Sequence, residues 1–351
     1  MRMSIQSLGV VGGFGCGTEA LQTALQTGRV EPQTGQVERN GTRDSFPIYQ
    51  AAIEGLDEFI PKRALRRIDH FSKMTLLGAC LALKEADLLE ADRSRMGVVI
   101  ATGYGALKTT FDFLDSYLDF GYSCSSPTHF SNSVHNAAAA HVSMQFKATA
   151  PSLTVTQFEM SVASALLTAQ QWLAEGRVDQ ILFGATDEYC EVLRYCRKMF
   201  FGEGEQGSLQ PFDFDKQSAV VGEGSTFFVL TRADENAPYG HIDTVTLGNH
   251  LVEPIILPET DFIIAGADGH SECGRWYADT LAGRAAASYA ALYGSFPAAA
   301  GFDLAVAAMS LRDQKIYAGA GVSEEQVMTD KQLACLKFGP GGDYGLIRLS
   351  G

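Results

Sequence analysis

A strand that turns directly into a helix, within residues 151–166, is the feature that most constrains the fold of this chain. Residues 153–156 are mostly β-branched and predict a strand, and the alanine-rich residues 160–175 predict a helix. Glu159 stands at the turn between them. Proteins use such a turn to hold a reactive side chain at a helix N-terminus. The segment therefore predicts an α/β architecture with a functional position at residue 159.

The rest of the chain alternates strands and helices in the same way. Apolar strands are predicted at residues 5–11, 96–102, 180–185, 225–230, 262–266, 333–338 and 345–349. Helices are predicted at residues 18–26, 73–86, 136–146, 160–175, 276–292 and 298–311. The charged segment 231–240 has the composition of a connector. We therefore expect two halves, residues 1–235 and 236–351, that together form one compact unit.

Composition excludes several functions. The chain has 351 residues, of which 46% are hydrophobic, so it can bury a large core. Its net charge of −14 argues against a nucleic-acid surface and against an anionic membrane surface. No apolar run approaches the roughly 20 residues of a membrane span. The seven cysteines lack metal-binding spacing, which indicates reduced thiols in a soluble, cytoplasmic protein.

Six short motifs carry a resemblance to a known family. In order and spacing they are similar to those of the β-ketoacyl synthases of fatty-acid and type II polyketide assembly, which share the thiolase fold. The motifs lie at residues 9–15, 136–143, 184–188, 210–215, 221–225 and 338–342. The resemblance covers nearly the whole chain. It implies two pseudo-symmetric βα halves in a layered α-β-α-β-α body.

The resemblance also implies that the catalytic residues are missing. These enzymes use a cysteine to carry the acyl chain, and two histidines and a lysine around it. Here Glu159 takes the place of the cysteine, Asp268 and Ser295 take the places of the histidines, and Ala290 takes the place of the lysine. A carboxylate cannot replace a thiolate in acyl transfer. We therefore expect a catalytically inactive protein that needs no cofactor and no metal.

Within this family, the subfamily that lacks the catalytic residues is the chain-length factor, which pairs with an active ketosynthase. By resemblance, this chain would form a heterodimer with a ketosynthase and set product length in polyketide, aryl polyene or fatty-acid-like biosynthesis. The acyl carrier protein would dock mainly on the partner. The edge strand expected at the dimer interface comprises Leu153, Thr154, Val155 and Thr156. The residues expected to line the acyl tunnel are Leu107, Thr110 and Leu114.

Alternatives remain open for these residues. Glu159 is either a carboxylate with a residual role at a helix N-terminus or a buried acid satisfied by backbone amides. If it is active, the chain is a stand-alone decarboxylase or thioesterase-like enzyme; a homodimeric scaffold is a third alternative. Asp268, His270 and Cys273 could bind zinc, although incidental positions are more common. The helical spacing of the expected tunnel residues equally fits a core stripe.

Overall fold

Eleven strands of the described residues form one mixed sheet. The computed structural model describes residues 1–39, 42–201, 209–257, 262–328 and 332–351. Ten strands follow one another across the sheet, and β2 (Gly15–Cys16) pairs with β1 off this path. The order is β11 (Ala286–Ala287), β10 (Phe262–Ala265), β14 (Gln332–Phe338), β15 (Asp343–Ser350), β9 (His241–Asn249), β1 (Met3–Gly12), β8 (Gly224–Arg232), β7 (Gln180–Asp187), β5 (Met96–Thr102) and β6 (Ser152–Thr156).

The two halves of this sheet repeat one pattern. In the first half β1, β8 and β7 are antiparallel neighbours, and β7, β5 and β6 run parallel. In the second half β9, β15 and β14 are antiparallel neighbours, and β14, β10 and β11 run parallel. The halves join where β1 pairs with β9. The expected domain boundary at residue 235 falls between β8 and β9.

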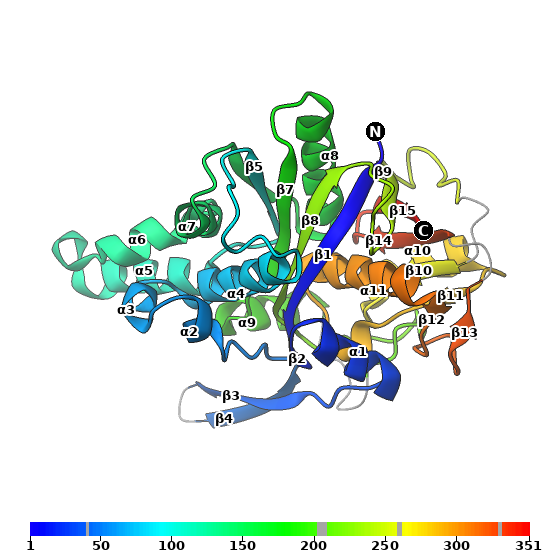
Figure 1. The fold of residues 1–351 in the computed structure, drawn as a ribbon. Helices are drawn as coiled ribbons and strands as arrows, with labels where there is room; N and C mark the ends of the chain where they lie inside the picture. The colour runs from blue at the N-terminus through cyan, green and yellow to red at the C-terminus, as the bar shows by residue number, and fades with distance from the viewer. Residues whose placement is uncertain (40–41, 202–208, 258–261, 329–331) are drawn as a thin grey trace.

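Helices cover the half-sheets and fill the space between them. Helix α4 (His70–Glu85) packs on β1, β8 and β7, and α7 (Ala137–Phe146) packs on α4 and β5. Helix α8 (Ser161–Ala174) and helix α11 (Ala300–Asp313) each contact strands of both halves. Helix α10 (Ser271–Leu281) packs on β14. This layering, visible in Figure 1, is the α/β thiolase fold that the motifs predict.

Helix α11 is buried on every side because its sequence is small and apolar almost throughout. All residues from Ala300 to Leu311 are buried, which is typical of a helix enclosed by two layers. The close approach depends on Gly301, since a Cβ there would lie 2.3 Å from Thr226 Oγ1 of β8. Glycine at this position therefore lets α11 pack directly on the sheet.

The remaining elements surround this layered body. They are α1 (Thr18–Thr27), β3 (Gln33–Arg39), β4 (Thr42–Ile48), α2 (Leu56–Phe59), α3 (Lys62–Leu65), α5 (Leu107–Phe120), η1 (Tyr122–Cys124), α6 (Pro127–Ser133), η2 (Phe158–Met160), α9 (Glu191–Phe201), η3 (Ala290–Leu292), η4 (Pro297–Ala299), β12 (Lys315–Ile316) and β13 (Gln326–Val327). Strands β3 and β4 form a hairpin, and β12 pairs with β13. Figure 1 shows α5, α6 and α7 together at one end, opposite β10 to β13.

One predicted helix is wrong in extent. We expected a helix over residues 276–292, but α10 ends at Leu281. Gly283 follows with a φ of +73°, which breaks the helix, and Ala286–Ala287 then adds a strand beside β10. Alanine-rich sequence suits either structure when both faces are buried, so the sheet edge decides the outcome. No described helix has both the length and the apolar character of a membrane span.

Candidate functional site

Glu159 occupies a tight elbow between β6 and α8. It lies in η2 and is half-buried. Its side chain lines a cavity of about 10 Å³ together with Asp303 and Lys337. A cavity of that size holds about one water molecule. Among the described residues no hydrogen bond to the Glu159 carboxylate occurs, so the structure does not bear out the interpretation that backbone amides satisfy it.

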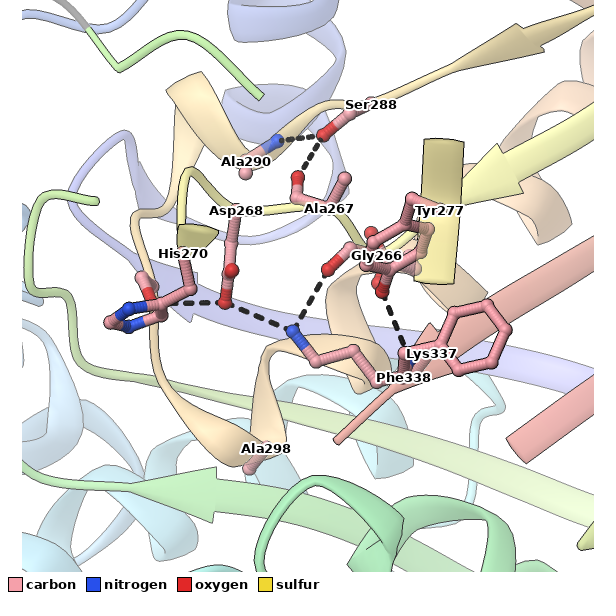
Figure 2. Close-up of polar contacts among 12 residues, drawn as sticks. Gly266, Ala267, Asp268, His270, Tyr277, Ser288, Ala290, Ala298, Lys337 and Phe338 are labelled. Atoms are coloured by element: carbon pink, nitrogen blue, oxygen red, sulfur yellow. Dashed lines mark hydrogen bonds and ion pairs between the residues drawn. The ribbon is translucent and has the colours of Figure 1, made fainter. Parts of the chain in front are cut away.

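A buried ion pair joins Asp268 to Lys337. Asp268 follows β10, and Lys337 belongs to the neighbouring strand β14. Their side chains form an ion pair of 2.9 Å, and both residues are less than a tenth exposed. Lys337 Nζ also donates to the carbonyl oxygen of Gly266 at 2.8 Å. Figure 2 shows the Lys337 ammonium held between these two oxygen groups.

The two partners stabilise each other's charged form. Burial alone would raise the pKa of Asp268, but the nearby charge of Lys337 outweighs it and holds the pKa well below its usual range. Burial alone would lower the pKa of Lys337, but the Asp268 carboxylate raises it above its usual range. The lysine therefore stays protonated and cannot act as a nucleophile.

Ser295 and His270 extend this network toward α9. Ser295 Oγ donates to Asp268 at 2.9 Å and accepts from Arg197 Nη2 at 2.8 Å. Arg197 also contacts His270 Nε2, and Gln217 Nε2 lies 3.0 Å from His270 Nδ1. Burial, together with the charge of Arg197, lowers the pKa of His270 to about 3. His270 is therefore neutral and serves as a half-buried hydrogen-bonding group.

Ala290 completes the set of four positions without adding chemistry. Its backbone N–H donates to Ser288 Oγ at 3.3 Å, and Ser288 Oγ donates to the carbonyl oxygen of Ala267 at 2.6 Å (Figure 2). The structure thus brings Asp268 and Ser295 into contact and places Ala290 beside them. Glu159 joins them through the cavity that it shares with Lys337.

This arrangement provides a filled polar interior with little room for a substrate. Ligand pockets usually measure about 300–1,000 Å³, far more than the cavity at Glu159. Burial raises the pKa of the Cys273 thiol to about 12, so Cys273 is no more reactive than other buried thiols. Within the described residues no group of three histidine, cysteine or acidic side chains could hold a metal ion. The expectation that Asp268, His270 and Cys273 do not bind zinc stays a prediction.

A second buried carboxylate, Asp187, holds the loops around the site. It accepts from Thr102 Oγ1 at 2.6 Å, from Gly103 N at 2.9 Å and from Ala298 N at 2.9 Å. Burial raises the pKa of Asp187 to about 6, although these donors oppose the rise. Asp187 therefore ties the ends of β5 and β7 to the loop that carries Ser295.

The residues expected at an interface are only partly covered. Strand β6 pairs with β5 on one side and ends the sheet, and Leu153 is 39% exposed. On α5, Leu107 and Thr110 are half-buried and Leu114 is exposed, so they do not form a core stripe within this chain. Ten of the seventeen exposed large apolar side chains recorded for the described residues fall between residues 114 and 158. We call these ten side chains the β6 face; they are Leu114, Tyr117, Leu118, Phe120, Tyr122, Phe130, Val134, Met144, Leu153 and Phe158.

Phe158, next to Glu159, has an unusual backbone. Its φ is +44°, a conformation that costs a side chain of this size about 1–3 kcal/mol. The ring is exposed, and it meets Tyr104 edge-on at 5.7 Å between ring centroids. Strain of this kind is concentrated at functional sites.

Sequence reasoning missed Lys337, Arg197 and Asp187. Lys337 had a signal, because it is a lone charge inside the apolar run of residues 333–338 and so needs a buried partner. Arg197 and Asp187 lie in separate elements and meet the site only through the tertiary fold. Their roles could not be read from local sequence patterns.

Comparison with protein families decides the assignment. Residues 10–236 match the model of the beta-ketoacyl synthase N-terminal domain. The chain belongs to the beta-ketoacyl synthase family. It is 25% identical over 249 residues to 3-oxoacyl-acyl-carrier-protein synthase 2 of Rhizobium meliloti, an alignment that covers 65% of this chain and 58% of the relative. The chain thus spans less than two thirds of the length of the curated relatives it matches.

Other relatives differ in the activity that their names give. Over 241 residues the chain is 25% identical to the polyketide biosynthesis malonyl-ACP decarboxylase PksF of Bacillus subtilis, covering 66% of this chain and 57% of PksF. Among solved structures, the ishigamide ketosynthase/chain length factor matches with a TM-score of 0.81 and 16% identity over 99% of this chain and 98% of that one. The type II ketosynthase AntDE in complex with its acyl-carrier protein AntF matches with a TM-score of 0.79 and 16% identity over 100% and 99% of the two chains. At this identity the structures establish the shared fold.

Removing the Lys337 charge should destabilise the protein strongly. We expect Lys337→Met to lower the free energy of unfolding by about 3–5 kcal/mol, because Asp268 is then left buried and unpaired. The double variant Lys337→Met with Asp268→Leu should lose much less than the sum of the single changes. Lys315→Met is the matched control, since its ion pair with Glu325 lies at the surface, with Lys315 partly exposed, and contributes at most about 1 kcal/mol.

The loss of stability caused by Lys337→Met should also depend on pH. The folded-state pKa of Asp268 is below its ordinary value of 3.8, so the ion pair contributes stability above that pH and loses it as the pH falls through the folded pKa. The orphaned Asp268 of the variant takes up a proton more readily. Urea unfolding measured across pH should therefore show a difference in the free energy of unfolding between the wild type and Lys337→Met that is large at neutral pH and smaller in acid. A difference that grows under acid would contradict this account.

Proposed function

We propose that this chain is a catalytically inactive, chain-length-factor-like subunit of a ketosynthase heterodimer in the cytoplasm. It closes one side of a shared acyl tunnel and limits chain length in polyketide, aryl polyene or fatty-acid-like biosynthesis. The observation that carries the proposal is the buried Asp268–Lys337 ion pair, to which Ser295 donates a hydrogen bond. By resemblance, Asp268 and Ser295 take the places of the family's two histidines. The partner supplies the cysteine and the histidines.

The electrostatics of the site support inactivity. Decarboxylative condensation needs a nucleophile and donors that can stabilise a developing oxyanion. Here the Lys337 ammonium is committed to Asp268 and Gly266, and the Ser295 hydroxyl is committed to Asp268. His270 is neutral and contacts Arg197 and Gln217. Rebuilding a catalytic site would require these contacts to break.

A stand-alone enzyme that uses Glu159 is the second candidate. Its support is the position of Glu159 beside a charged cavity, together with the similarity to a relative named as a malonyl-ACP decarboxylase. The small size of the cavity weighs against it. A homodimeric scaffold remains the third alternative.

Replacing Glu159 with glutamine separates the first two candidates. Glutamine has nearly the same shape but cannot act as a base. We expect the isolated wild-type chain to turn over neither malonyl nor acyl thioesters, and we expect Glu159→Gln to leave product formation by the reconstituted complex within about twofold. Assays of thioester consumption and product mass test both points. Turnover by the isolated wild type that Glu159→Gln abolishes would establish the enzyme.

The acyl tunnel is proposed to run beside α5. Leu107, Thr110 and Leu114 lie on one face of this helix and are incompletely buried within the chain, so a partner or an acyl chain can cover them. Strand β6 ends the sheet and can pair with the equivalent strand of the partner. The β6 face supplies apolar surface around it.

A bulkier side chain at Thr110 should shorten the product. We expect Thr110→Trp to reduce the length of the longest product of the complex by at least one extension unit, because the indole takes up tunnel volume. Asp119→Trp is the matched control, since residue 119 lies about 180° around the same helix from residue 110. Product masses measured for both variants check the prediction. Unchanged products for Thr110→Trp in an intact complex would place the tunnel elsewhere.

Docking of the acyl carrier protein is proposed to occur mainly on the ketosynthase. Carrier proteins are acidic, and a chain with a net charge of −14 repels them. One observation points the other way. Five cations fall within twelve residues, and four of them are exposed on and after α3; the five are Lys62, Arg63, Arg66, Arg67 and Lys73. We call them the basic ridge.

Charge reversal on the basic ridge tests where the carrier binds. If the carrier docks mainly on the partner, Arg63→Glu with Arg66→Glu should change the KM of the complex for carrier-bound substrate by less than about threefold. Both side chains are exposed, so the fold should survive. Steady-state kinetics with intact heterodimer check this result. A rise of more than about tenfold that shrinks at higher salt, where the added repulsion is screened, would assign carrier docking to this chain.

A further inference from the structure

The backbone at Phe158 differs in kind from the other strained positions of this chain. Four non-glycine residues among those described have a positive φ: Asp87, Lys147, Phe158 and Gln314. Lys147 and Gln314 cap the C-termini of α7 and α11, and Asp87 follows the C-terminal cap of α4. A left-handed residue is common at the end of a helix. Phe158 instead is the first residue of η2, which precedes α8, so no helix C-terminus accounts for its conformation.

Packing within the chain does not account for the side chain either. The Phe158 ring is 58% exposed, and its recorded aromatic contact is the edge-on one with Tyr104. Glycine would adopt the same φ without strain. The chain thus has a large apolar side chain at a position where both the backbone and the solvent oppose it. Some other contact must favour phenylalanine there.

The surroundings of Phe158 indicate what that contact is. Phe158 lies two positions after Thr156, the last residue of the edge strand β6. It belongs to the β6 face, whose other members lie on α5, η1, α6, α7 and β6 and in the segments joining them. Of these helices, α5 contacts α6, α6 contacts α7 and α7 contacts β6, so the elements that carry these exposed side chains are neighbours in the fold. An apolar surface of this kind around a sheet edge is typical of a protein interface.

We propose that Phe158 is an anchor residue that the partner ketosynthase buries. The inference rests on the proposed heterodimer and names the side chain that holds it at the elbow. Aromatic side chains contribute a large share of interface energy when a partner pocket encloses them. The partner site is an apolar pocket beside the edge strand that pairs with β6.

The elbow then has two sides with separate roles. Glu159 faces the inner cavity beside Lys337, and Phe158 is exposed on the outer side. The strained turn fixes the direction of the Phe158 ring before the partner arrives, which lowers the conformational cost of docking. A turn that elsewhere in the family mounts a nucleophile would here mount a docking side chain.

Two substitutions at Phe158 test the anchor. We expect Phe158→Ala and Phe158→Gly each to weaken the heterodimer with the co-expressed ketosynthase by at least about tenfold in Kd. Phe158→Gly should keep wild-type stability, because relief of strain offsets the added freedom of the unfolded chain. Val327→Ala is the control, since Val327 is apolar and even more exposed than Phe158, at 84% against 58%, but lies on β13 at the opposite end. It should bind as the wild type does.

A photo-crosslinker at residue 158 detects contact with the ketosynthase directly, independently of any change in stability. Replacing Phe158 with p-benzoylphenylalanine should capture the ketosynthase on irradiation, and the same replacement at Val327 should not. If the wild-type chain binds the ketosynthase but both Phe158 variants bind equally well and no crosslink forms, the anchor is wrong and the proposed function stands. If the wild-type chain binds no ketosynthase, the proposed function fails and the anchor fails with it.

Discussion

The burial of two small-residue helices between two half-sheets is the constraint on which the rest of this structure depends. Helices α8 and α11 each contact strands of both halves, and Gly301 lets α11 approach β8 closely. The elbow with Glu159 precedes α8, and the loop with Ser295 precedes α11. The fold therefore brings these two positions together through packing alone. Packing alone thus fixes the geometry of this site, whichever side chains occupy it.

What fills that geometry here is an internal ion pair. Burying Lys337 or Asp268 alone would cost several kcal/mol, but together they form an ion pair. Lys337 also donates a hydrogen bond to Gly266, and Asp268 accepts one from Ser295. Such a network stabilises one arrangement and resists the shifts that a reacting substrate needs. The network is therefore consistent with the scaffold role that we propose. Rigidity is also what a subunit needs if it is to set the length of a tunnel.

Much of the fold could be predicted from the sequence, because its strands are apolar runs and its elbow is a local pattern. Strand β5 was predicted with its observed bounds, and β6 and α8 within one residue. The helix expected to reach residue 292 was wrong, since alanine-rich sequence carries no preference strong enough to decide between a buried helix and a buried edge strand. The motifs predict four substituted positions, Glu159, Asp268, Ser295 and Ala290, and this alignment with the family's catalytic residues stays a prediction. Lys337, Arg197 and Asp187 could not be assigned to the site, because their partners are distant in sequence.

The central claim is that this chain is one half of a mixed dimer. Native mass spectrometry of the chain co-expressed with a ketosynthase from the same genome tests that claim most directly. The account predicts a complex with equal numbers of the two chains that persists through purification and dilution. A chain that remains a homodimer while the ketosynthase pairs with itself would contradict it.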